Sequence, residues 1–185
     1  TTVIAFVISL ISLLRKGVEN FVAKATAAAF ALFYIPFLTG FFILLARPHD
    51  GFERVATAIV LVASNDTFGY VVGVLIGRHK LVPKISPKKS IEGLFGSIVF
   101  NIIFGVLTFK YFLDLPIWLG VLVGLLVVFT ATTGDLVESA LKRDFALKDM
   151  GQFLPGHGGV MDRLDSILFS GPALWLVLEL ATRYL

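Results

Sequence analysis

Residues 134–166 read GDLVESALKRDFALKDMGQFLPGHGGVMDRLDS and lie between two strongly apolar segments. The stretch holds six carboxylic acids, four lysine or arginine side chains and one histidine, in a chain that is otherwise mostly apolar. A solvated polar loop between membrane helices is one explanation of this charge. Acids at the edge of a hydrocarbon segment are costly, however, and usually have a function. We therefore treat residues 134–166 as a candidate site.

The spacing of the charges predicts how this stretch folds. Asp135, Glu138 and Lys142 follow one another at i, i+3 and i+7, and so line one face of a helix. Asp162 and Asp165 repeat the i, i+3 spacing, and the PGHGG segment at 155–159 between the two sets cannot be a helix interior. A turn there would place the second acidic helix start beside the first. Clustered carboxylates need a cation such as Mg²⁺, and glycine-rich turns with nearby basic residues suit phosphate.

Composition places the chain in the membrane. Of its 185 residues, 57% are hydrophobic, and the mean hydropathy is +0.89. These values exceed those of soluble domains. The chain has no cysteine, which excludes disulfides and thiol catalysis. Its net charge is only +3, and its basic residues cluster at predicted helix ends rather than in one stripe, which argues against a nucleic-acid partner.

The expected fold is all-α: a polytopic integral membrane protein with about five to six transmembrane helices in one membrane domain. Residues 3–14 are apolar but short for a span, which needs roughly 20 residues. Residues 1–78 comprise the membrane helices up to and including the Asp66 helix. Residues 79–185 comprise a basic loop, further helices and the 134–166 motif. The predicted spans are 25–46 with a kink at Pro36, 55–77, 94–113, 117–134 and 164–185.

Two further segments carry candidate residues. Asp66 shares a predicted helix face with Gly69, Tyr70, Gly73 and Gly77, which is either a small-residue packing stripe or a helix that aims Asp66 into a polar cavity. Residues 78–93 are basic and contain two prolines, so they are expected to form a loop rather than a helix.

The residues from Ser139 to Asp165 follow the pattern S-x2-KR-x4-KD-x-G-x3-PGHGG-x2-DR-x-D, which resembles the signature of bacterial phosphatidate cytidylyltransferases. The Asp66 helix and the SPKKSIEG segment at 86–93 are similar to further motifs of that family, although Asn65 stands where the family has a hydroxyl residue. Members are usually longer, so this chain resembles the C-terminal two-thirds of one, without the N-terminal membrane helices.

This resemblance implies the transfer of a cytidylyl group from CTP to phosphatidic acid, which gives CDP-diacylglycerol and pyrophosphate. It also implies a Mg²⁺ or other divalent cation as cofactor. A second cation, monovalent or divalent, is a further expectation. Asp135 and Asp162 would be the main metal ligands. Asp66, Glu138 and Asp165 are second candidates, as ligands or as groups that orient ligands. The catalytic candidates are Asp135, Asp162, Lys142, Arg143 and His157, where His157 is equally explained as a turn residue. The substrate-binding candidates are Ser86, Lys88, Lys89, Lys148, Gly156, Gly158, Gly159 and Arg163.

The positive-inside rule predicts the orientation. Twelve of the sixteen basic residues fall on the side of the loops that contain Lys16, Lys88 and Lys148, and four fall on the other side: Arg47, Arg54, Lys110 and Arg183. The candidate site should therefore face the cytoplasm from the inner membrane. A homodimer is a further expectation. The alternative functions are a CTP-dependent polyprenol kinase and an ion-coupled transporter, whose intramembrane acids would bind ions.

Overall fold

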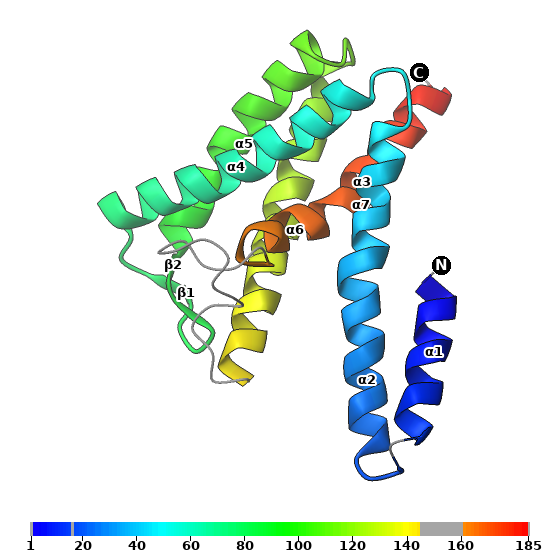
Figure 1. Ribbon diagram of the computed structural model, residues 1–185. Helices are drawn as coiled ribbons and strands as arrows, with labels where there is room; N and C mark the ends of the chain where they lie inside the picture. The colour runs from blue at the N-terminus through cyan, green and yellow to red at the C-terminus, as the bar shows by residue number, and fades with distance from the viewer. Residues whose placement is uncertain (1, 16, 145–160, 185) are drawn as a thin grey trace.

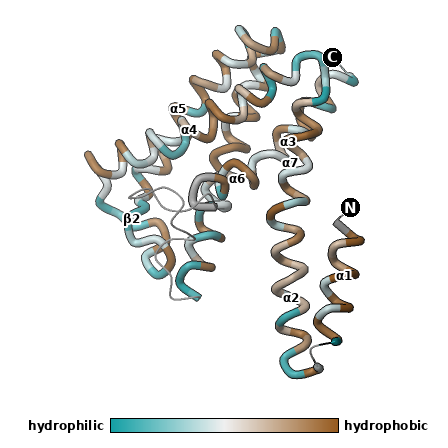
Figure 2. Tube along the Cα trace, viewed as in Figure 1, coloured by the Kyte–Doolittle hydropathy of each residue, from teal (hydrophilic) through white to brown (hydrophobic). Residues whose placement is uncertain are grey.

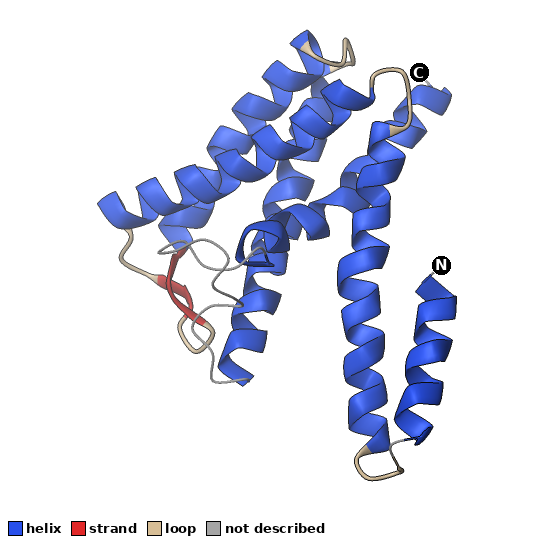
Figure 3. Cartoon of the chain, viewed as in Figure 1, coloured by secondary structure: helices blue, strands red, loops and turns tan. Residues whose placement is uncertain are grey.

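The computed structural model describes residues 2–15, 17–144 and 161–184, and of residues 2 and 161–163 it describes the backbone only. Helices dominate the chain, as predicted (Figures 1 and 3). Their order is α1 (Thr2–Arg15), α2 (Phe21–Leu32), the π-helical segment η1 (Phe33–Phe37), α3 (Leu38–Ala46), α4 (Gly51–Ile76), β1 (Lys80–Val82), β2 (Ser86–Ser90), α5 (Ile91–Tyr111), α6 (Ile117–Asp144) and α7 (Met161–Tyr184).

Five helical runs in the described residues are long and apolar enough to cross a membrane, which confirms a polytopic α-helical membrane protein. They are Phe21–Ala46, Gly51–Ile76, Ile91–Tyr111, Ile117–Asp144 and Leu164–Tyr184. The shorter α1 accounts for the sixth apolar segment. The span expected over 117–134 and the predicted charged helix face form one continuous helix, α6, which runs ten residues past position 134 and carries Asp135, Glu138 and Lys142.

Pro36 lies inside the first spanning run, where η1 separates α2 from α3. Proline has no backbone N–H and cannot donate the hydrogen bond of a regular helix, so the helix widens by one residue at this place. The irregularity predicted at Pro36 is therefore present, in the form of a π turn.

The predicted small-residue stripe on α4 is a packing seam. A Cβ added to Gly93 would lie only 2.5 Å from the carbonyl oxygen of Gly69, so α4 and α5 touch backbone to backbone. Ser97 Oγ also donates to the carbonyl of Asn65 across this seam, at 2.7 Å. Tyr70 is not part of it, because its side chain is 70% exposed.

Residues 80–90 form a two-stranded antiparallel hairpin in which Lys80 pairs with Ser90 and Val82 with Ser86. The sequence predicted a loop there without strands. Figure 2 shows hydrophilic segments in this hairpin and at the end of α6, and others at the turns between helices. The main apolar core lies toward the opposite ends of the helices, around Leu45, Leu61 and Phe109. We call the end of the bundle that holds the hairpin and the last turns of α6 the polar end.

Candidate active site

The charged face predicted on α6 is formed. Glu138 is only 2% exposed, and its Oε2 lies 2.7 Å from Nζ of Lys142, one turn further along the helix. A buried carboxylate is costly unless a cation compensates its charge, and Lys142 supplies that cation. Arg143 and Asp144 are exposed at the end of the same helix.

Helices α6 and α7 cross closely at the level of the acids. A Cβ added to Gly134 would lie 2.6 Å from the carbonyl oxygen of Asp165, so only a glycine fits at this crossing. Asp165 is 5% exposed, and its Oδ1 accepts a hydrogen bond of 2.7 Å from the backbone N–H of Ser166. The second acidic helix start therefore lies beside the first, as the sequence predicted.

The hairpin brings a lysine to this crossing. Nζ of Lys89, on β2, lies 2.7 Å from Oδ2 of Asp135, and both side chains are about one-third exposed or less. Nearer the tip of the hairpin, Nε of Arg143 donates to the carbonyl of Ile85 at 3.4 Å. These two contacts fasten the basic segment to the charged face of α6, although the two are more than forty residues apart in the sequence.

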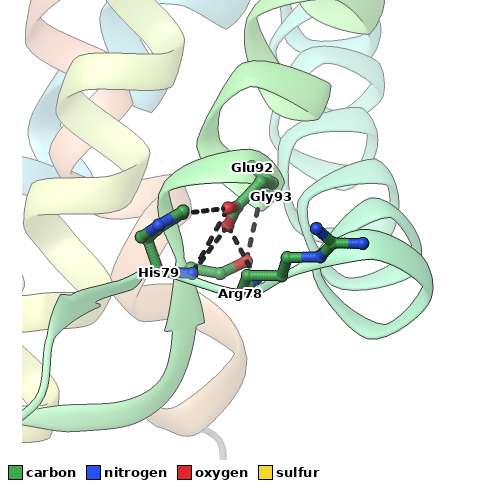
Figure 4. A network of polar contacts seen from close by, with 5 residues as sticks. Arg78, His79, Glu92 and Gly93 are labelled. Carbon is green, nitrogen blue, oxygen red and sulfur yellow. Dashed lines mark hydrogen bonds and ion pairs between the residues drawn. The ribbon is translucent and has the colours of Figure 1, made fainter.

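Glu92 holds the other end of the hairpin (Figure 4). Its carboxylate accepts hydrogen bonds from the backbone N–H groups of Arg78 and His79 at 3.1–3.2 Å and contacts His79 Nδ1 at 2.7 Å. Ser90 caps the start of α5 by accepting from the N–H of Gly93 at 3.1 Å. The segment that carries Lys88 and Lys89 is thus anchored at its base.

A third helix contributes Asp66. This residue is exposed, and its Oδ1 accepts a hydrogen bond of 2.9 Å from Asn65 Nδ2. Asp66 interacts electrostatically with Asp135 and Lys89, and Asp165 with Asp135, Asp66 and Lys142. Carboxylates from α4, α6 and α7 therefore form one electrostatic cluster with the Lys89 ammonium. We call Asp66, Asp135, Glu138 and Asp165 the carboxylate cluster.

The chemistry of this cluster fits a divalent cation, since carboxylate oxygens are hard ligands. Among the described side chains, however, no group of three lies close enough to hold a metal ion together. Asp135 forms an ion pair with the ammonium of Lys89 instead. The ligand set expected from the sequence stays a prediction.

Several candidates lie outside the described side chains: Lys148, Gly156, His157, Gly158, Gly159, Asp162 and Arg163. Of the other substrate-binding candidates, Lys88 is exposed and Ser86 half-buried on β2, beside Lys89. The described part of the chain thus brings together Asp66, Lys89, Asp135, Glu138, Lys142 and Asp165.

Tyr34 also belongs to this region, and the sequence did not point to it. Its ring packs against Phe169 of α7, and the same small core includes Val137 and Leu164, which directly precede Glu138 and Asp165. The one available signal was its place two residues before Pro36, within the predicted kink.

Comparison with known proteins agrees with the motifs. The model of a family described as "Cytidylyltransferase family" matches residues 1–181. The chain is 45% identical over 163 residues to "Phosphatidate cytidylyltransferase" of Mycobacterium leprae, covering 88% of this chain and 52% of that protein. It is 42% identical over 154 residues to the protein of the same name from Staphylococcus haemolyticus, covering 82% and 59%. The chain thus spans about half the length of the curated relatives that it matches.

Proposed function

This chain belongs to the cytidylyltransferase family, and from that membership we propose that it transfers the cytidylyl group of CTP to phosphatidic acid. The products are CDP-diacylglycerol and pyrophosphate. A phosphate oxygen of the lipid attacks the α-phosphorus of CTP, and the bond from that phosphorus to the leaving pyrophosphate breaks. The attacking oxygen is already anionic, so the reaction needs no serine–histidine pair.

The difficulty of this reaction is charge, because an anionic lipid must approach a polyanionic nucleotide. The observation that carries the proposal is the contact between Lys89 and Asp135, which joins the two segments that resemble family motifs. In this proposal Lys88, Lys89 and Arg143 bind phosphate oxygens and offset their charge. Lys142 offsets the charge of Glu138 within the packed helices, at 2.7 Å.

We further propose that Asp135 and Asp162 hold a Mg²⁺ ion, with Asp66, Glu138 and Asp165 as additional ligands or as groups that orient ligands. When bound, such an ion neutralises negative charge on the reacting phosphates. The carboxylates would then position the ion, and the basic side chains would bind the phosphates.

The proposal predicts a defined product and by-product. Membranes that contain the full-length protein, incubated with labelled CTP and phosphatidic acid, should yield labelled CDP-diacylglycerol and pyrophosphate, and EDTA should abolish both. Release of CDP with a phosphorylated polyprenol would favour the kinase instead. Lipid-free ion flux in vesicles would favour the transporter. Full activity after exhaustive chelation would contradict the divalent metal.

We also propose that the polar end of the bundle faces the cytoplasm from the inner membrane. The hairpin and the end of α6 lie at one end of the bundle, while the turns at 47–50 and 112–116 lie at the other (Figure 1). Lys84 is exposed in the hairpin turn and His49 is exposed in the opposite loop. Because this chain has no cysteine, each can be replaced by a single reporter thiol.

In intact cells, the thiol of Lys84→Cys should react with an impermeant reagent only after the membrane is permeabilised. The thiol of His49→Cys should react in intact cells. The twelve-to-four distribution of basic residues is the reason for this expectation. The reverse labelling pattern would place the site outside the cell.

A further inference from the structure

Tyr34 is a buried polar side chain on the first spanning run, at its contact with α7. It is 4% exposed and packs with Leu38 and Leu168, and its ring centroid lies 5.6 Å from that of Phe169 at an interplanar angle of 60°. It belongs to η1, and π turns within helices often occur at functional sites. The ring is therefore fixed in place by aliphatic and aromatic contacts.

The hydroxyl is less well accommodated than the ring. Its oxygen is buried, and among the residues that the structure describes it has no hydrogen-bond partner. A buried donor without a partner is destabilising, and a phenylalanine would fill the same space without that cost. Val137 and Leu164 pack against the same small core as Tyr34, and they directly precede two carboxylates of the cluster, Glu138 and Asp165. The unused donor thus lies beside the candidate site.

We propose that the hydroxyl of Tyr34 donates a hydrogen bond to a phosphate oxygen of a bound substrate. Tyr34 would then be a substrate-binding residue that the first spanning run contributes to the site. This inference rests on the proposed function, and the phosphate is that of either phosphatidic acid or CTP.

A neutral donor suits this position for an electrostatic reason. The ammonium groups of Lys89 and Lys142 are each drawn to a carboxylate of the cluster, at 2.7 Å in both cases. The phenol hydroxyl of Tyr34, by contrast, has no hydrogen-bond partner among the described residues, so its donor is available to a phosphate oxygen. A charged acceptor also gives the stronger hydrogen bond.

The test is Tyr34→Phe in the full-length protein, which removes the hydroxyl and keeps the ring. We expect kcat/KM for CDP-diacylglycerol formation to fall about 10- to 100-fold, as for loss of a hydrogen bond to a charged group. The melting temperature should stay the same or rise. A higher KM for phosphatidic acid at saturating CTP would assign the bond to the lipid phosphate, and the converse would assign it to the nucleotide.

Tyr111→Phe is the matched control, because Tyr111 is 68% exposed at the far end of α5 and should tolerate the same change. A wild-type kcat/KM for both substrates in Tyr34→Phe would overturn the inference and leave the proposed function intact. A lowered melting temperature that accompanies the lost activity would also overturn it, since the hydroxyl would then serve folding. A wild-type protein that makes no CDP-diacylglycerol would contradict the proposed function itself.

Discussion

Asp135→Asn is expected to lower the rate of CDP-diacylglycerol formation by about 100-fold or more, the scale of losing a group that stabilises charge in the transition state. Asparagine keeps the shape of the side chain but removes the charge that holds Lys89 at 2.7 Å and would bind a cation. The measurement is turnover across a Mg²⁺ titration in the full-length protein, with yield and thermal melting followed in detergent.

Asp144→Asn is the matched control on the same helix, because Asp144 is exposed at its end and should change the rate little. Lys89→Gln separates the two roles of Asp135, because it removes the partner of the ion pair and keeps the carboxylate. If Asp135 also binds a cation, Asp135→Asn/Lys89→Gln should turn over more slowly than Lys89→Gln and respond less to Mg²⁺. Equal turnover and equal Mg²⁺ dependence of these two variants would mean that Asp135 serves only to pair with Lys89.

The same reasoning extends to Asp162, which we propose as a ligand of the same metal. If both residues serve one metal, Asp162→Asn should be as harmful as Asp135→Asn, and the double variant little worse than either. Losses that multiply in the double variant would mean that the two carboxylates act independently.

Gly134→Ala is expected to damage both stability and activity although it adds a single methyl group. The new Cβ would lie 2.6 Å from the carbonyl oxygen of Asp165 and 3.0 Å from Cβ of Phe169. Backbone cannot yield as a flexible side chain does, so α6 and α7 must move apart, at a cost of about 1–3 kcal/mol. A displacement of about 1 Å between Asp135 and Asp165 could lower turnover by about 100-fold.

Gly40→Ala provides the comparison, since a Cβ at Gly40 meets nothing within 4 Å. Removing a helical glycine there should be neutral or stabilising by up to about 1 kcal/mol. Thermal melting and turnover should therefore separate the two alanine variants. Equal behaviour of the two would mean that the α6–α7 crossing does not position the acids.

Apolar length was sufficient to predict the spanning helices, because a membrane span depends on composition over about 20 residues rather than on particular contacts. The charged face of α6 was also predictable, since the i, i+3, i+7 spacing is local. The continuity of the span with this charged face was not predictable: the span was expected to end at 134, but one helix runs to Asp144. Charged residues ended the apolar pattern without ending the helix.

The contacts between elements were harder to predict. In the hairpin at 80–90, β1 has only three residues and β2 is polar with a proline, so neither shows the alternating pattern of a strand. Its position is set by two contacts with α6, from Lys89 to Asp135 and from the carbonyl of Ile85 to Arg143, which no local pattern encodes. Tyr34 was missed for the same reason, because its importance depends on how the first spanning run packs on α7.

The length of α6 has a consequence for where the lipid would react. At 28 residues the helix is about 42 Å long, against a hydrocarbon layer of about 30 Å. Asp135 stands eighteen residues from Ile117, about 27 Å along the axis. With Ile117 at one boundary of the hydrocarbon and α6 along the membrane normal, Asp135 would lie near the other boundary, between acyl chains and headgroups. A phosphatidic acid molecule resting in its own leaflet carries its phosphate at that depth. Under the proposed function its acyl chains could stay in the hydrocarbon throughout the reaction, which avoids a transfer to water that costs about 0.8 kcal/mol for every methylene group.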